Sequence, residues 1–214
     1  MVLLLLLAVA GNLACTAGHG QVPDFAAKSQ FTESSGTTQT AVLAGGCFWG
    51  VDAVFKHVKG VNNVVSGFSG GDADTAAYEV VSTGTTGHAE SVRIAYDPSQ
   101  VSYSELLRVF FSVAHDPTEL NRQGPDGGTQ YRSVIFYANE DQRRIALAYI
   151  DQLNKAKVFG APIVTQVVPL KEFYPAETYH QNFLERHPHD PYIMMFDQPK
   201  LRALQKEFPG VYKP

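Results

Sequence analysis

Apolar residues in the first half of the chain follow two different spacings, which predict strands and helices in turn. Ala41 to Ala44 is a short apolar run that is ended by two glycines, and this suits a buried strand. From Val51 to Val58 the apolar residues repeat at helical spacing, and Gly60 suits the end of that helix. Ser91 to Tyr96 alternates polar and apolar residues. This alternation predicts a second strand.

The second half of the chain carries clear helix starts. Ser102 and Glu105 have the spacing of a capping box, so a helix should begin there. Asn139 can cap a further helix from about Glu140 to Lys155. Two more strands are predicted at 131–137 and 163–168.

Strands and helices are thus mixed without strict alternation, which determines the expected fold class. We expect an α+β fold, a two-layer sandwich with a mixed β-sheet and helices packed on it. Between residues 115 and 129 the content of Pro, Gly, Asp and Asn marks a long loop. Loops of this length inside a domain are usually functional.

The N-terminal residues predict a targeting segment. Val2 to Ala10 is an unbroken apolar run, too short for a membrane-spanning helix of about 20 residues but of the length of a secretory signal. Leu13 to Cys15 resembles the end of a lipoprotein signal, so residues 1–15 are predicted to be a signal peptide or a lipoprotein signal. The protein would then be exported, either periplasmic or anchored to a membrane. No Lys or Arg precedes Lys28, so a misassigned start with a cytoplasmic protein, or a buried N-terminal element, stays an alternative.

Composition divides the rest of the chain and excludes one class of partner. Residues 16–39 are rich in Ser, Thr, Gly and Gln and predict a flexible tether, residues 40–196 the catalytic domain, and residues 197–214 a C-terminal tail. The 214 residues are long enough for one substantial core. The net charge of −4 and the absence of a basic cluster exclude nucleic acid as an expected partner. The balanced surface charge favours a monomer.

Cys47 is the candidate reactive residue. The only other cysteine is Cys15, in the predicted signal, so a disulfide within the domain is not expected. Cys47 lies between a predicted strand and the first turn of a predicted helix, where free N–H groups and the helix dipole favour a thiolate and a lowered pKa. An inert buried cysteine is the alternative. Flanking glycines and the apolar side chains of Phe48 and Trp49 favour a reactive thiol with a substrate wall beside it.

Six motifs in order resemble one enzyme family, the A-type peptide methionine sulfoxide reductases. They are Gly46-Cys47-Phe48-Trp49-Gly50; Gly67-Phe68-Ser69-Gly70-Gly71; Thr86-Gly87-His88-Ala89-Glu90; His115-Asp116-Pro117-Thr118; Asn121 to Asp126 with Gly128 to Ser133; and Phe173 to Glu177 with Tyr179-His180-Gln181. The resemblance runs from about residue 41 to 195. It implies a fold related to the ferredoxin-like folds and the reduction of methionine S-sulfoxide, free or in proteins, as a repair of oxidised proteins.

The resemblance also implies a role for each matching residue. Cys47 would attack the sulfoxide sulfur and become a sulfenic acid. Glu90 matches the acid, whose pKa burial should raise so that a proton stays available. The other implied site residues are Tyr78 and Tyr131 as hydroxyl donors to the sulfoxide oxygen, Asp126 as a carboxylate in the same pocket, and Phe48 and Trp49 around the S-methyl group.

The chain departs from the family pattern near its C-terminal end. Many relatives carry resolving cysteines there, but Met195 to Pro214 contains none. No bound cofactor or metal is expected, and turnover should use an external thiol such as thioredoxin, glutaredoxin or glutathione. A retained Cys15 that resolves Cys47 is a further hypothesis, since the 31 intervening residues, if flexible, would reach about 30 Å.

Two other functions stay open at the level of the sequence. One is a cysteine hydrolase in which Cys47 pairs with His88, His115 or His180. The other is a secreted metal-binding module that uses the histidines, especially His187 and His189, although their spacing fits no known metal site.

Overall fold

A six-stranded mixed sheet is the centre of the computed structural model, which describes residues 21–28 and 38–214. The sheet order is β7-β6-β1-β3-β2-β8. Its strands are β1 (Gln39–Ala44), β2 (Val61–Ser69), β3 (Ala89–Tyr96), β6 (Val134–Tyr137), β7 (Gln166–Pro169) and β8 (Tyr174–Pro175). β6 and β7 are parallel and the other neighbours are antiparallel. The predicted mixed sheet is therefore confirmed.

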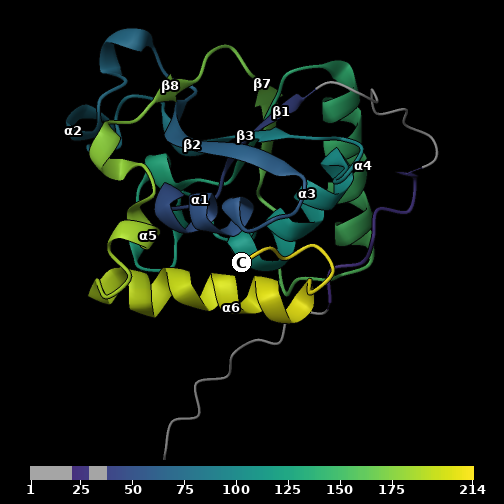
Figure 1. Cartoon of the computed structure of the whole chain (residues 1–214). Helices are drawn as coiled ribbons and strands as arrows, with labels where there is room; N and C mark the ends of the chain where they lie inside the picture. Colours follow the sequence, from purple (N-terminus) through teal and green to yellow (C-terminus); the bar gives the residue numbers. More distant parts are fainter. Residues whose placement is uncertain (1–20, 29–37) are drawn as a thin grey trace, which may run out of the picture.

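The helices gather around this sheet as the α+β prediction requires. They are α1 (Phe48–Lys56), α2 (Tyr78–Val81), α3 (Tyr103–Val109), α4 (Glu140–Lys155), α5 (Phe183–Arg186) and α6 (Gln198–Glu207). Two π-helical turns, Phe110–Ala114 and Ile193–Asp197, continue α3 and precede α6. Figure 1 shows α1 beneath the sheet and α6 along the side of α1 that faces away from it. A hairpin of β4 (Arg122–Gln123) and β5 (Asp126–Gly127) lies outside the sheet.

Alternation along β1 shows how the two faces of the sheet are covered. Ala41 and Leu43 belong to the large core that α1, α3 and α4 help to build. Val42 and Ala44 point to the opposite face and pack in a second cluster with residues of the segment 168–173. The helices thus cover one face, and an extended segment covers the other.

The predicted helix starts are confirmed. The side chain of Ser102 accepts a hydrogen bond from the Glu105 N–H, and the Glu105 carboxylate accepts one from the Ser102 N–H. The Asn139 side chain accepts from the Gln142 N–H at 2.9 Å.

Some strand predictions were wrong in extent. The strand expected at 163–168 is β7 at Gln166–Pro169, and the strand expected from Tyr131 begins at Val134, because 129–131 form a 3₁₀ turn. β2 was not predicted at all. Its two consecutive asparagines and its register shift between Val61 and Asn63 interrupt the alternation that marks a strand.

The C-terminal boundary was also wrong, because residues 197–214 are part of the folded domain rather than a tail. α6 packs on α1, and Leu204 in its middle is 0% exposed. The Lys59 N–H donates to the Val211 carbonyl, and the Lys213 N–H donates to the His57 carbonyl. α6 is polar on most of its surface, so its few apolar positions gave only a weak signal in the sequence.

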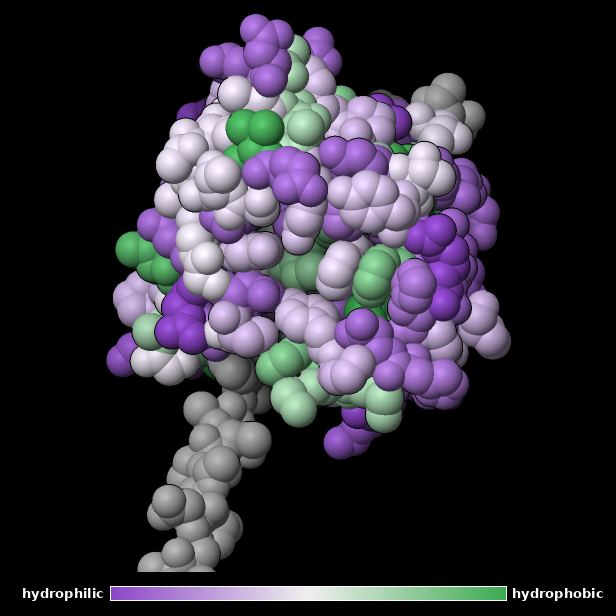
Figure 2. Space-filling model, turned by 90° about the vertical axis from the view of Figure 1, so that its left-hand side faces the viewer, coloured by the Kyte–Doolittle hydropathy of each residue, from purple (hydrophilic) through white to green (hydrophobic). Residues whose placement is uncertain are grey.

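α2 and α5 lie at the same side of the molecule, on the left of Figure 1. Figure 2 shows this side, which is hollowed near its centre with hydrophobic residues at the bottom of the hollow. The functional side chains described below come from the elements around this side.

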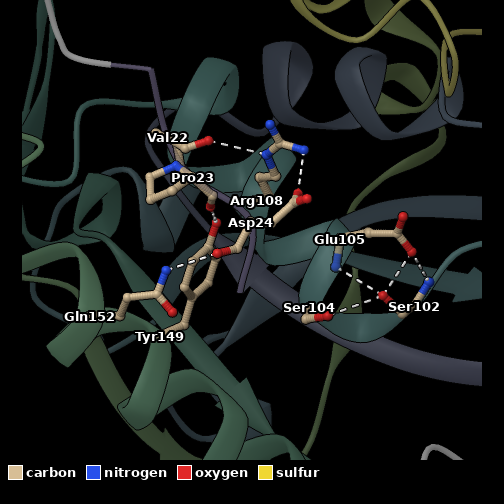
Figure 3. A network of polar contacts seen from close by, with 9 residues as sticks. All are labelled: Val22, Pro23, Asp24, Ser102, Ser104, Glu105, Arg108, Tyr149 and Gln152. Carbon is tan, nitrogen blue, oxygen red and sulfur yellow. Dashed lines mark hydrogen bonds and ion pairs between the residues drawn. The ribbon is translucent and has the colours of Figure 1, made fainter. Parts of the chain in front are cut away.

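Part of the predicted tether is instead folded against α3 and α4. Residues 21–28 form a strap that buries Val22 and Phe25. Figure 3 shows the Arg108 guanidinium donating to the Val22 carbonyl and pairing with Asp24, and the Tyr149 hydroxyl donating to the Pro23 carbonyl. The prediction of a flexible tether was therefore wrong for this stretch, because two isolated apolar residues and several carbonyls find partners on helices far along the chain.

The remaining N-terminal predictions fall outside this part of the chain. The signal at 1–15, including Cys15, and residues 16–20 and 29–37 of the tether lie outside the described residues. Among the residues that are described, no helix combines the length and the apolar character needed to cross a bilayer.

Replacing Phe25 with Ala should loosen the strap without changing activity. The ring is 3% exposed and meets Tyr149 edge-on at 5.5 Å between centroids. Its loss should lower the free energy of unfolding by up to about 3 kcal/mol, and by less if the strap detaches first. Hydrogen exchange of the Ala26 N–H, which donates to Gln152, measures that detachment. Phe25→Leu is the control that keeps an apolar side chain in place, and unchanged exchange in Phe25→Ala would contradict this account of the strap.

Candidate active site

Cys47 stands at the N-terminal end of α1, directly after the glycine turn that follows β1. Gly46 has φ +89°, and a Cβ there would lie 2.5 Å from the Gln123 side chain, so only glycine fits this turn. Gln123 is itself fixed, since its amide exchanges two hydrogen bonds with the backbone of Asp116. The Cys47 side chain is 7% exposed and is the free cysteine of the described residues.

The thiol is held in its protonated form, which corrects one expectation from the sequence. Burial raises the pKa of Cys47 well above its ordinary value, and the nearby carboxyl groups of Glu90 and Asp197 raise it further. A hydrogen bond from the Trp49 N–H lowers the pKa but does not compensate. The lowered pKa predicted from the helix N-terminus was wrong. Removing the thiolate from water costs more free energy than the N–H groups of one helical turn can offset.

Glu90 is the acid next to this thiol. It lies on β3, is 2% exposed, and its Oε2 accepts a hydrogen bond from the Phe48 N–H at 3.0 Å. Phe48 is the residue after Cys47, so this bond ties the carboxyl group to the turn that carries the sulfur. Burial raises the pKa of Glu90 to about 8, with the charge of Asp126 adding to the rise. Glu90 therefore keeps a proton at neutral pH, as the sequence predicted.

Aromatic rings build the wall beside Cys47. Phe48 is fully buried and contacts Phe68 and His180, with centroids 5.8 Å and 5.1 Å away. The Trp49 ring stacks on Phe183 of α5 at 3.7 Å and meets the edge of Tyr192. The two predicted substrate-wall residues are thus held in a continuous aromatic cluster.

Tyr78 and Tyr131 reach the same place from two loops. Tyr78 begins α2, and Tyr131 ends the 3₁₀ turn Thr129–Tyr131. Burial raises the pKa of both phenols, and Glu90 and Cys47 would raise both further once they are ionised. Both hydroxyls therefore stay protonated and can donate hydrogen bonds.

Asp126 is the last of the predicted site residues. It contacts Tyr192, a residue that the sequence analysis did not predict. The Tyr192 hydroxyl donates a hydrogen bond to Asp126 Oδ2. Burial raises the pKa of Tyr192, and its ring meets the edge of the Trp49 indole beside Cys47. No motif quoted from the sequence included Tyr192, and nothing in its local pattern marked it.

Asp197 is a second missed residue. It is fully buried at the end of a π-helical turn, where its Oδ1 pairs with Lys200 at 3.1 Å. A Cβ on Gly50 would lie 2.1 Å from that oxygen. The last glycine of the first motif therefore lets the C-terminal segment bring a carboxylate to the first turn of α1.

The three histidines that a cysteine hydrolase could use have other hydrogen-bond partners. His88 accepts from the Gly71 N–H and bonds the Asp72 carbonyl, while His115 bonds the Phe110 carbonyl and the Ser133 hydroxyl. Burial lowers the pKa of His115 to about 4. His180 accepts from the Trp49 indole at 3.1 Å. These bonds give each of the three histidines a structural partner other than Cys47.

The metal-binding reading gains no support either. Across residues 21–28 and 38–214 there is no group of three or more His, Cys, Asp or Glu side chains arranged to hold a metal ion. His187 and His189 are exposed beside α5.

The protonated thiol predicts a distinctive reactivity with pH. Alkylation of Cys47 by iodoacetamide should still be rising at pH 9 in the resting enzyme, because only the thiolate reacts and the pKa of Cys47 lies above that value. Glu90→Gln should shift the profile to lower pH, since it removes the negative charge that Glu90 carries next to the sulfur above about pH 8. Mass spectrometry of the alkylated protein measures the rate, and a plateau below pH 8 would contradict the assignment.

Comparison with known proteins identifies the family. The sequence model of the family described as "Peptide methionine sulfoxide reductase" matches residues 39–210. A methionine sulfoxide reductase of Mesorhizobium japonicum is 61% identical over 175 residues, which cover 82% of this chain and 90% of that protein. One from Synechocystis is 54% identical and covers 80% of both chains.

Solved structures show the same relationship. Reduced Mxr1 from Saccharomyces cerevisiae has a TM-score of 0.65 at 31% identity and covers 75% of this chain and 91% of its own. Methionine sulfoxide reductase A of Corynebacterium diphtheriae has a TM-score of 0.62 at 35% identity, covering 79% and 85%. With the site geometry above, these matches show that the chain belongs to the A-type peptide methionine sulfoxide reductases, thiol-dependent enzymes that reduce methionine S-sulfoxide to methionine without a bound cofactor.

Proposed function

We propose that Cys47 is the nucleophile of this reduction and that Glu90 is its acid. Both groups are protonated in the resting site, and the Phe48 N–H fixes the Glu90 carboxyl next to the turn of Cys47. A sulfoxide sulfur becomes electrophilic when its oxygen is protonated or strongly hydrogen-bonded. The pairing of a buried neutral carboxylic acid with a single buried thiol is the observation that carries this proposal.

The reaction needs no net proton. The Cys47 sulfur first forms a bond to the electrophilic sulfoxide sulfur. The oxygen then passes to the Cys47 sulfur as this S–S bond and the S–O bond of the substrate break, so that two electrons pass from the thiol sulfur to the substrate sulfur. Glu90 donates a proton to the oxygen and accepts the proton of the thiol. The products are therefore methionine and a Cys47 sulfenic acid.

The other residues position the substrate and stabilise charge. Tyr78 and Tyr131 donate hydrogen bonds to the oxygen as negative charge develops on it. Trp49 and Phe48 surround the S-methyl group. Asp126, held by the Tyr192 hydroxyl, is placed to bind a polar group of the substrate backbone.

Regeneration requires a reductant from outside the site. Two thiols reduce the sulfenic acid through a mixed disulfide and release water. We propose a thioredoxin-like protein as the physiological donor, acting on a monomeric enzyme, with oxidised proteins and peptides as the substrates. Size-exclusion chromatography and turnover with purified thioredoxin and its reductase test these two points.

The apolar N-terminal run supports a proposal about the cell compartment. We propose that the protein is exported, either periplasmic or anchored as a lipoprotein, because Val2 to Ala10 has the length of a signal sequence. Fractionation of cells that express the full chain, with and without Cys15→Ser, separates the anchored, soluble exported and cytoplasmic forms.

A single turnover without reductant tests the role proposed for Cys47. The protein should form about one equivalent of methionine from the S epimer, none from the R epimer, and a dimedone adduct on Cys47. Methionine without an adduct on Cys47, or an adduct on another residue, would overturn the assignment of the nucleophile.

A further inference from the structure

The turn between β8 and α5 places a histidine, His180, at the aromatic wall of the site. It consists of Glu177, the 3₁₀ turn Thr178–His180, and Gln181. His180 is 2% exposed, and its ring lies against Tyr78 at 4.3 Å and against Phe48 at 5.1 Å between centroids. It therefore touches the aromatic cluster of the site, but the chemistry above assigns it no task.

The hydrogen bond to Trp49 fixes the tautomer of His180. An indole N–H can only donate, so Nδ1 of His180, 3.1 Å from Trp49 Nε1, must be the unprotonated acceptor and Nε2 must carry the proton. Burial lowers the pKa of His180 and keeps the ring neutral. The imidazole is thus available as an acceptor throughout the neutral range.

The backbone of this turn is held from both sides. Gln181 accepts from the Ser66 N–H of β2 and donates to the Ser66 carbonyl, at 2.9 Å each. Glu177 Oε1 accepts from the Tyr78 N–H at the start of α2, also at 2.9 Å. His180 is therefore a fixed point between the sheet and the loop that brings Tyr78.

The Trp49 indole also packs against three rings, those of His180, Phe183 and Tyr192. Such ring contacts are less directional than a hydrogen bond. A single hydrogen bond at Nε1 selects one orientation of the ring.

We propose that His180 is a positioning residue that orients the Trp49 indole through its Nδ1, and so sets the binding of the substrate's S-methyl group. The proposal rests on the role given to Trp49 in the proposed function. It predicts an effect on substrate binding rather than on the chemical step, because Trp49 contacts the methyl group in the bound substrate and in the transition state alike.

Two variants of matched shape test the acceptor alone. His180→Asn keeps an oxygen at the position of Nδ1, and His180→Leu has the same branching without an acceptor. KM for methionine S-sulfoxide should be about tenfold higher in His180→Leu than in His180→Asn, the factor expected for one lost buried hydrogen bond, while kcat changes by less than about threefold. Equal KM values in the two variants would overturn the proposal.

A direct readout is available because Trp49 is the only tryptophan of the chain. Its indole gives one ¹H–¹⁵N resonance, which should shift upfield in His180→Leu and stay near its wild-type position in His180→Asn. In the wild-type protein a scalar coupling between Trp49 Nε1 and His180 Nδ1 should be measurable across the hydrogen bond. Absence of that coupling would overturn the proposal even if His180→Leu did not fold.

Trp49→Phe separates this proposal from the proposed function. In that background the indole N–H is gone, so the KM values of the two His180 variants should agree within about twofold. If Trp49→Phe alone left KM unchanged, the methyl-binding role of Trp49 would fail, whereas the indole resonance would still decide whether His180 orients the ring. A difference between the His180 variants that persisted in Trp49→Phe would show that His180 acts through another group and would overturn the proposal.

Discussion

Cys47→Ser should abolish the reduction of methionine S-sulfoxide, with a loss of roughly 10⁵-fold or more in kcat. The reaction moves two electrons from the attacking atom to the substrate. A serine hydroxyl is less nucleophilic, and it cannot take up the oxygen, because the oxidised product would be a hydroperoxide. No other cysteine lies in residues 21–28 or 38–214 to replace it. The rate of methionine formation with excess dithiothreitol measures the loss.

The substitution is also well suited to show that the loss is chemical. Cys47 caps α1 with its backbone conformation, and its side chain makes no cap hydrogen bond, so serine should leave the helix start intact. Circular dichroism and the midpoint of urea unfolding should stay close to those of the wild type. Residual S-epimer reduction above about 1% in folded Cys47→Ser would mean that another residue performs the attack.

The chemistry was predictable because it lies in contiguous motifs. Cys47 with its flanking glycines stands out by residue type and local pattern, whereas Glu90 was named through the resemblance to the reductase family. The structure adds why the glycines are there, since Gly46 adopts a positive φ against Gln123 and Gly50 admits Asp197. Local sequence thus predicted which residues gather, and it could not predict what each glycine contacts.

Residues that act through long-range contacts were missed. Tyr192 and Asp197 reach the site from the end of the chain, and their roles appear only once α6 packs along α1. The direction of the shift in the Cys47 pKa was predicted wrongly for a related reason. A helix start is a local feature, whereas the burial and the carboxyl groups that dominate come from β3 and the C-terminal segment.

The C-terminal segment therefore belongs to the site electrostatically. Asp197 is buried with Lys200, and the two act on Cys47 in opposite directions, the carboxyl raising its pKa and the ammonium lowering it. Because the raising effect of Asp197 is the larger, the segment helps to keep the thiol protonated in the resting site.

Glu90→Gln should lower kcat by about 10²- to 10⁴-fold, the usual contribution of one general acid. The amide has the shape of the neutral carboxyl group, and its oxygen can still accept the hydrogen bond from the Phe48 N–H. It cannot transfer a proton to the sulfoxide oxygen. Single-turnover formation of methionine measures the effect on the chemical step, separately from regeneration by thiols. Glu90→Asp, which keeps an ionisable group on a shorter side chain, should retain more activity than the amide.

The same substitution should stabilise the protein, which distinguishes an acid from a structural residue. Folding raises the pKa of Glu90 from 4.5 to about 8, so above pH 4.5 the unfolded state releases a proton that the folded state retains. Stability therefore falls as the pH rises from 4.5 to 8, and at pH 7 the cost is about 3 kcal/mol. Glu90→Gln has no proton to release and escapes this cost. Urea unfolding at pH 5 and pH 7 should show a variant that is about equal to the wild type at the lower pH and more stable at the higher one. A variant that lost both activity and stability at pH 7 would instead show that Glu90 is ionised and serves to hold the fold.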